Sequence, residues 1–160
     1  MQEVTTTLNQ ANKLFKTADH LAYVTYPLLK DNKLIITIAE NLTEAMVKAM
    51  EAMLYYERNY KRIQHFPSDF KSKIEIFKLT CNHYNIPRNY LVLIQTLHDI
   101  IEKRKASKME FIRQDKYVIF NNNLDIITLN YDKIKEYLNK RAIGLFEKNM
   151  KTGDRYISWG

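Results

Sequence analysis

Two long stretches of the chain repeat apolar residues at alternating spacings of three and four, the pattern of helices that bury one face. The first repeat covers about residues 4–28, and Pro27 is expected to bend or end that helix. The second repeat covers about residues 33–64. The polar residues 30–32 leave only a short turn between them. We therefore predict a long antiparallel helical hairpin.

The second predicted helix is apolar on more than one face. Large apolar residues widen its buried surface: Met46, Val47, Met50, Met53 and Leu54. A helix of this kind lies either at the centre of a bundle or at an interface with a second copy of the chain. We expect a homodimer through this helix, and the central position is the alternative.

The rest of the chain predicts shorter elements. In order, these are a helix at about 68–84 with Ser68 at its N-cap, a helix at about 87–105, a β-hairpin at about 117–129 with an Asn-rich turn at 121–123, and a helix at about 131–148. The predicted fold is mostly α. It is an antiparallel bundle of four or five helices with a small β-hairpin in a single domain at 1–148, followed by a tail at 149–160.

Composition agrees with a helical domain that has a real core. Hydrophobic residues make up 46% of 160 residues, with only three glycines and three prolines. One cysteine, Cys81, excludes an internal disulfide and points to a reducing compartment. We see no signal peptide, and the longest apolar runs fall far short of the ~20 residues that cross a membrane. We therefore expect a cytoplasmic protein with no membrane contact.

The net charge of +7 favours an anionic partner such as RNA. Residues 1–50 carry five cations and five anions, residues 51–100 carry seven and five, and residues 101–160 carry thirteen and eight. The basic character therefore belongs to the second half of the chain.

Motifs for metal binding or nucleophilic catalysis are lacking. No Glu has a His three residues later, as a di-iron bundle requires, and the glycines form neither a phosphate-binding loop nor a nucleophile elbow. His98, with Asp99 and Glu102, is a weak metal alternative to a hydrogen-bonded surface cluster. We expect no metal and no cofactor.

Two cationic segments are candidates for contact with nucleic acid. The first interleaves tyrosines with Arg58, Lys61 and Arg62 and ends at His65, a combination that can stack bases and hold phosphate. The alternative is that these cations favour the C-terminal end of a helix dipole. The second segment holds Lys103, Arg104, Lys105 and Lys108, for which the alternative is a solvated helix end. We expect Trp159, in the tail, to dock on this chain or on a partner.

Two stretches carry a resemblance to known proteins. Residues 16–33, KTADHLAYVTYPLLKDNK, and residues 54–67 resemble a family of small archaeal helical-bundle proteins of uncharacterised function. More distantly, Arg58-Asn59 followed by His65 is similar to the signature of HEPN domains, which are helical bundles that often dimerise and, in active members, cleave RNA. This second resemblance implies that Arg58 and His65 are catalytic residues that position and activate the RNA 2′-hydroxyl and phosphate without a metal.

Three hypotheses for function remain. The first is a non-enzymatic module that interacts with RNA or a ribonucleoprotein. The second is a HEPN-like ribonuclease that uses Arg58 and His65. The third is a structural or adaptor bundle that binds a protein partner. The sequence leaves open whether the protein is an enzyme.

Overall fold

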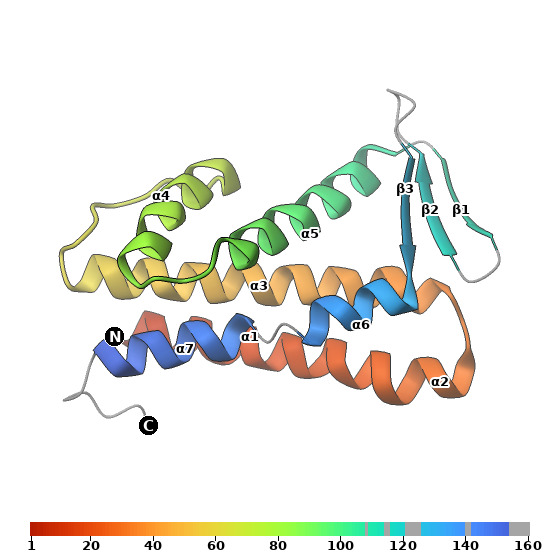
Figure 1. Ribbon diagram of the computed structural model, residues 1–160, viewed down its shortest axis with the longest axis horizontal. Helices are drawn as coiled ribbons and strands as arrows, with labels where there is room; N and C mark the ends of the chain where they lie inside the picture. The colour runs from red at the N-terminus through yellow and green to blue at the C-terminus, as the bar shows by residue number, and fades with distance from the viewer. Residues whose placement is uncertain (108, 114–115, 121–125, 140–141, 154–160) are drawn as a thin grey trace.

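The computed structural model describes residues 1–107, 109–113, 116–120, 126–139 and 142–153. Its elements in chain order are α1 (Gln2–His20), the π-helical turn η1 (Leu21–Thr25), α2 (Tyr26–Leu29), α3 (Lys33–Asn59), α4 (Phe70–His83), α5 (Arg88–Ala106), β1 (Met109–Arg113), β2 (Lys116–Phe120), β3 (Ile126–Asn130), α6 (Tyr131–Asn139) and α7 (Ala142–Gly153). Figure 1 shows helices packed around α3, with the strands at one end. The predicted mostly helical bundle with an antiparallel hairpin is confirmed.

Helix α3 lies at the centre of the bundle. It contacts α1, α4, α5, α6 and α7, and Figure 1 shows α4 and α5 on one side with α1, α6 and α7 on the other. Its Met46, Met50, Met53 and Leu54 side chains are all buried within this one chain. The apolar faces of α3 are therefore covered by the chain's own helices, and a homodimer through this helix stays a prediction.

Helices α1 and α3 pack together as the predicted helical hairpin, and both contain buried small side chains. Ala11 and Ala18 of α1 are fully buried, as are Ala45, Ala49 and Ala52 of α3. Because alanine ends at Cβ, two helices that meet through alanines can lie close along their length. Figure 1 shows the two helices running side by side.

The helical segment from Gln2 to Leu29 stays continuous but widens into a π turn just before Pro27. Proline has no N–H, and its ring collides with the carbonyl four residues earlier in a regular α-helix. A π turn relieves such a conflict and leaves a carbonyl without its usual partner. The Tyr131 hydroxyl donates to the Ala22 carbonyl oxygen at 2.5 Å, and its ring stacks on Tyr26. This contact joins the start of α6 to the first helical segment.

Helix α3 ends at Asn59, so the predicted extension to residue 64 is wrong. Lys61 adopts the left-handed conformation with φ of 57°. The Lys61 amide donates to the Arg58 carbonyl, and the Arg62 amide donates to the Glu57 carbonyl. This is the Schellman ending, in which a left-handed residue usually filled by glycine closes the helix. Apolar spacing alone could not reveal it, because a lysine holds the glycine position.

Helix α4 begins at Phe70 with Asp69 as its N-cap, so the prediction of Ser68 as the cap is wrong. The Asp69 carboxylate accepts a hydrogen bond from the Ser72 amide at 2.9 Å, which lowers the pKa of Asp69. At its C-terminal end, Asn85 is left-handed and the Ile86 amide donates to the Cys81 carbonyl. Helix α4 thus closes with the same motif as α3.

The predicted β-hairpin is the antiparallel pair β2–β3, with Val118 opposite Thr128. Tyr117 and Ile119 alternate along β2 and are buried, so one face of the hairpin packs against the bundle. Strand β1, which the sequence analysis did not assign, pairs antiparallel with β2 at the outer edge. The Asn-rich turn at 121–123 lies outside the described residues.

The predicted last helix is two helices, α6 and α7, with residues 140–141 outside the described part of the chain. Helix α7 continues to Gly153, into the segment predicted as a tail. Residues 154–160, which include Trp159, also lie outside the described part. In the ranges described, no helix combines the length and apolar character needed to cross a lipid bilayer.

Candidate nucleic-acid interface

The first predicted patch lies where α3 ends and the chain turns towards α4. We call it the α3 corner, and its residues are Tyr55, Arg58, Tyr60, Lys61, Arg62, His65 and Phe66. The Arg58 guanidinium donates to the Glu3 carboxylate at 2.5 Å. It also lies over the ring of Tyr55, 5.0 Å from the centroid, and over that of Phe66, at 5.7 Å. Arg58 therefore joins the end of α3 to the start of α1 while stacking on aromatic faces.

Arg62 belongs to a hydrogen-bonded triad with a buried carboxylate. The Glu57 side chain is only 4% exposed, and its carboxylate accepts from Arg62 at 3.0 Å and from the Tyr84 hydroxyl at 2.5 Å. Burial and the bond to Glu57 raise the pKa of Tyr84 above its usual value. For Arg62, burial opposes the charge, but the bond to Glu57 and the neighbouring Tyr84 outweigh it and raise the pKa.

Lys61 and His65 are exposed members of the α3 corner, as are Tyr60 and Arg62. Among the residues described, neither Lys61 nor His65 has an ion pair with a carboxylate, and no hydrogen bond joins His65 to Arg58. The Tyr60 side chain is 37% exposed, with the Arg62 guanidinium 4.9 Å from its ring centroid. The corner thus presents an unpaired ammonium group beside a stacked guanidinium and an accessible aromatic ring.

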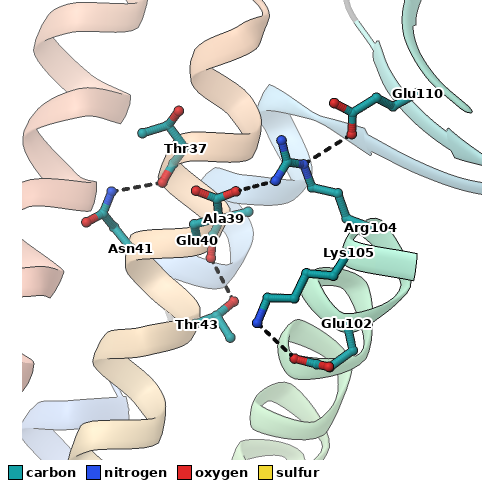
Figure 2. Close-up of polar contacts among 9 residues, drawn as sticks. All are labelled: Thr37, Ala39, Glu40, Asn41, Thr43, Glu102, Arg104, Lys105 and Glu110. Carbon is teal, nitrogen blue, oxygen red and sulfur yellow. Dashed lines mark hydrogen bonds and ion pairs between the residues drawn. The ribbon is translucent and has the colours of Figure 1, made fainter. Parts of the chain in front are cut away.

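The second predicted patch is organised differently. We call it the α5 end, and it comprises Lys103, Arg104 and Lys105 with their carboxylate partners. The Arg104 guanidinium lies 2.8 Å from Glu40 of α3 and 3.2 Å from Glu110 of β1, as Figure 2 shows. It also hydrogen-bonds Tyr117 of β2, and that bond is the largest cause of its raised pKa. Arg104 therefore connects α3, α5 and the sheet.

The other cations of the α5 end differ in exposure and pairing. The Lys105 ammonium lies 3.2 Å from the Glu102 carboxylate one turn earlier (Figure 2). Lys103 is exposed, and in the described part of the chain it has no ion pair. Lys108 lies outside the described residues. Carboxylates therefore neutralise two of the three described cations of this patch.

Of the candidate metal ligands, His98 Nε2 lies 3.9 Å from the Glu102 carboxylate. Within the described ranges, no three His, Cys, Asp or Glu side chains form a group that could hold an ion. His98 stacks on Phe70 with ring centroids 3.5 Å apart, and burial lowers the pKa of His98 despite Glu102 and Asp99. Cys81 is buried, and burial raises the pKa of its thiol to about 12, so it stays protonated and unreactive near neutral pH.

Several residues of the α3 corner's network carried no sequence signal. Glu3 and Tyr84 are far from Arg58 and Arg62 in the chain, and only the packing of α1 and α4 on α3 brings them close. Compared with protein-family models, curated proteins and solved structures, the chain matches none.

Proposed function

We propose that this protein is a non-enzymatic module that interacts with RNA or a ribonucleoprotein, with the α3 corner as the contact surface. The observation that carries the proposal is the exposed Lys61 beside Tyr60 and the stacked Arg62. Unpaired RNA bases stack on aromatic rings and guanidinium planes, and an ammonium group holds the phosphate. Among the described residues, the corner supplies both kinds of contact within a few residues.

The α5 end contributes less to this proposal. Arg104 and Lys105 are paired with carboxylates, so an approaching phosphate would have to compete with Glu40, Glu102 and Glu110. Lys103 is the described cation of this patch that remains available. We therefore assign the α5 end a secondary, long-range electrostatic role in holding RNA.

The HEPN-like ribonuclease needs Arg58 and His65 at one scissile phosphate. Arg58 is bonded to Glu3, and His65 lies beyond the end of α3 in the connection to α4. Nothing specific in the described geometry favours this alternative over binding alone. The assay below reads cleavage together with binding, so it decides between them.

Two lysines with the same backbone conformation provide a test variant and a matched control for RNA binding. Lys61 and Lys30 are both exposed and both left-handed, with φ of 57° and 53°. Glycine adopts this conformation readily, so Lys61→Gly and Lys30→Gly each remove one charge without straining the turn. Binding of labelled single-stranded and structured RNA is measured by fluorescence anisotropy at about 50 mM and about 200 mM salt.

We expect salt-sensitive binding that Lys61→Gly weakens about three- to tenfold and whose salt slope falls by about one. Lys30→Gly should leave the affinity close to that of the wild type. Equal effects of the two variants would contradict the assignment to the α3 corner. Absence of RNA binding would reject the proposal in favour of an adaptor that binds protein. Cleavage abolished by His65→Ala would establish the ribonuclease instead.

A further inference from the structure

A groove of about 590 Å³ runs between the middle of α1 and the junction of α6 with α7. Its size is within the roughly 300–1,000 Å³ of small-ligand sites. The floor is apolar, formed by Phe15 of α1 with the buried Leu138 and Ile143. Because α1 and α7 meet only in the folded bundle, sequence spacing could not have revealed this groove.

Gly144 lines the groove and has no structural reason to be glycine. It is an exposed residue in the first turn of α7 and has no positive φ, and a Cβ built on it would meet nothing within 4 Å. Glycine inside a helix costs about 1 kcal/mol relative to alanine. Among the described residues, neither the backbone conformation of Gly144 nor its packing requires a glycine. The missing side chain instead leaves the α7 backbone open to close approach by a ligand.

The rim of the groove is polar and carries groups of both charges. Asn12 and Asn139 offer amides from opposite sides, and the Tyr23 hydroxyl donates to Asn139 Oδ1 at 3.1 Å. This bond leaves the Asn139 NH₂ available as a donor. Lys16 and Asp19 are exposed, and in the described part of the chain neither has an ion-pair partner. Among the described residues, apolar side chains, two amides, one cation and one anion therefore line the same space.

We propose that this groove binds a single nucleotide. The base would lie on the apolar floor against Gly144, where Asn12 and Asn139 can hydrogen-bond its edge. Lys16 would hold the phosphate, and the Asp19 carboxylate would accept from the ribose hydroxyls, as an acidic residue does in dinucleotide sites. The nucleotide could be free or part of an RNA strand, because both present the same base, sugar and phosphate.

The RNA form of this proposal rests on the function proposed above. Glu3, bonded to Arg58 of the α3 corner, and Lys16 of the groove lie on the same helix. Their thirteen-residue separation corresponds to about 20 Å along α1. One RNA strand could therefore contact the corner and place an unstacked base in the groove.

The test begins with adenosine 5′-monophosphate titrated into the full chain by isothermal titration calorimetry, with adenosine and ribose 5-phosphate as partial ligands. We expect the whole nucleotide to bind, and each partial ligand to bind at least tenfold more weakly. Lys16→Ala should weaken nucleotide binding about tenfold through loss of the charged contact. Lys13→Ala, an exposed lysine of the same helix outside the groove, should leave it unchanged.

Gly144→Leu tests whether the open space beside Gly144 is needed for nucleotide binding. The added side chain enters open space, so the melting temperature should not fall, but the groove should lose nucleotide binding. The RNA assay then separates the two proposals. RNA binding that is weakened by Lys61→Gly but unaffected by Lys16→Ala and Gly144→Leu, without mononucleotide binding, would overturn the groove and keep the α3 corner. Mononucleotide binding without RNA binding would support the groove as a free-nucleotide site and overturn the proposed function.

Discussion

The α3 corner and the α5 end each hold an arginine whose guanidinium contacts carboxylate and tyrosine partners, yet the two groups are arranged oppositely. At the corner, the carboxylate is the buried member, and Glu57 accepts from both Arg62 and Tyr84. At the α5 end, Arg104 lies at the centre, and its partners Glu40 and Glu110 are 43% and 40% exposed. The same residue types therefore build a buried acceptor in one region and a surface connection in the other.

The difference shows that burial of the carboxylate decides whether its arginine and tyrosine donors can be exchanged for water. A buried carboxylate must keep its donors, since an unsatisfied charge away from water is costly. Exposed carboxylates can exchange a donor for water at little cost. Basic residues in a sequence therefore say little about ligand binding until the position of their acidic partners is known.

The largest expected effect is that of removing the buried acceptor. Glu57→Ala should lower the free energy of unfolding by about 2–3 kcal/mol, because Tyr84 loses its partner in a half-buried site and Arg62 loses its ion pair. Urea denaturation at neutral pH measures the change. Glu75→Ala, which breaks an exposed pair with Lys78, is the control and should cost less than about 0.5 kcal/mol. Equal effects of the two variants would remove burial as the explanation.

A smaller effect is expected at the α5 end. Arg104→Met keeps much of the side chain's length but removes its bonds to Glu40, Glu110 and Tyr117. We expect a loss of about 1–2 kcal/mol, with amide exchange accelerated in β1 and β2 more than in α3. Lys103→Met should leave the free energy of unfolding within about 0.5 kcal/mol of the wild-type value. It should not accelerate amide exchange in β1 and β2. Uniform acceleration over the whole chain would show that Arg104 does not act locally on the sheet.

The smallest effect concerns alkaline pH. Burial raises the pKa of both Tyr84 and Tyr117, but Arg104 opposes the rise at Tyr117 by hydrogen bonding, whereas Glu57 reinforces it at Tyr84. A tyrosine whose pKa is raised on folding stabilises the protein below about pH 10, and this contribution is lost as the pH rises further.

The two tyrosines can be compared through unfolding measured at about pH 8 and about pH 10.5. Tyr84→Phe should flatten the alkaline loss of stability more than Tyr117→Phe. Cys81 contributes equally to both variants and cancels from the comparison. A greater flattening by Tyr117→Phe would contradict the stronger rise in pKa expected at Tyr84, where the bond to Glu57 adds to the effect of burial.

Much of the fold followed from apolar spacing. The long hairpin of α1 and α3, helices α4 and α5, and the pair β2–β3 all appear near their predicted positions. The errors fall where local backbone chemistry overrides the pattern. A lysine in the left-handed conformation closes α3 five residues early, and Asp69 rather than Ser68 caps α4. Strand β1 was missed because its sequence, MEFIR, includes two charged residues and lacks the uninterrupted apolar run that Tyr117–Phe120 gives to β2.

The candidate site was less accessible to sequence reasoning. The cations Arg58, Arg62 and Arg104 could be found by composition, but their partners are contributed by other elements. The groove beside Gly144 joins residues more than a hundred positions apart. Spacing along one helix identifies a face, whereas a site between elements depends on tertiary packing.

The central position of α3 also has a consequence for synthesis on the ribosome. Its last residue, Asn59, precedes the first residue of α6, Tyr131, by about 70 residues. At roughly 5–20 residues per second, translation reaches the first residue of α6 only roughly 4–14 s after α3 is made, and α7 follows later. During that interval the nascent chain lacks the two helices that contact α3 in the folded bundle. The apolar core around α3 is therefore complete only after α6 and α7 have been translated.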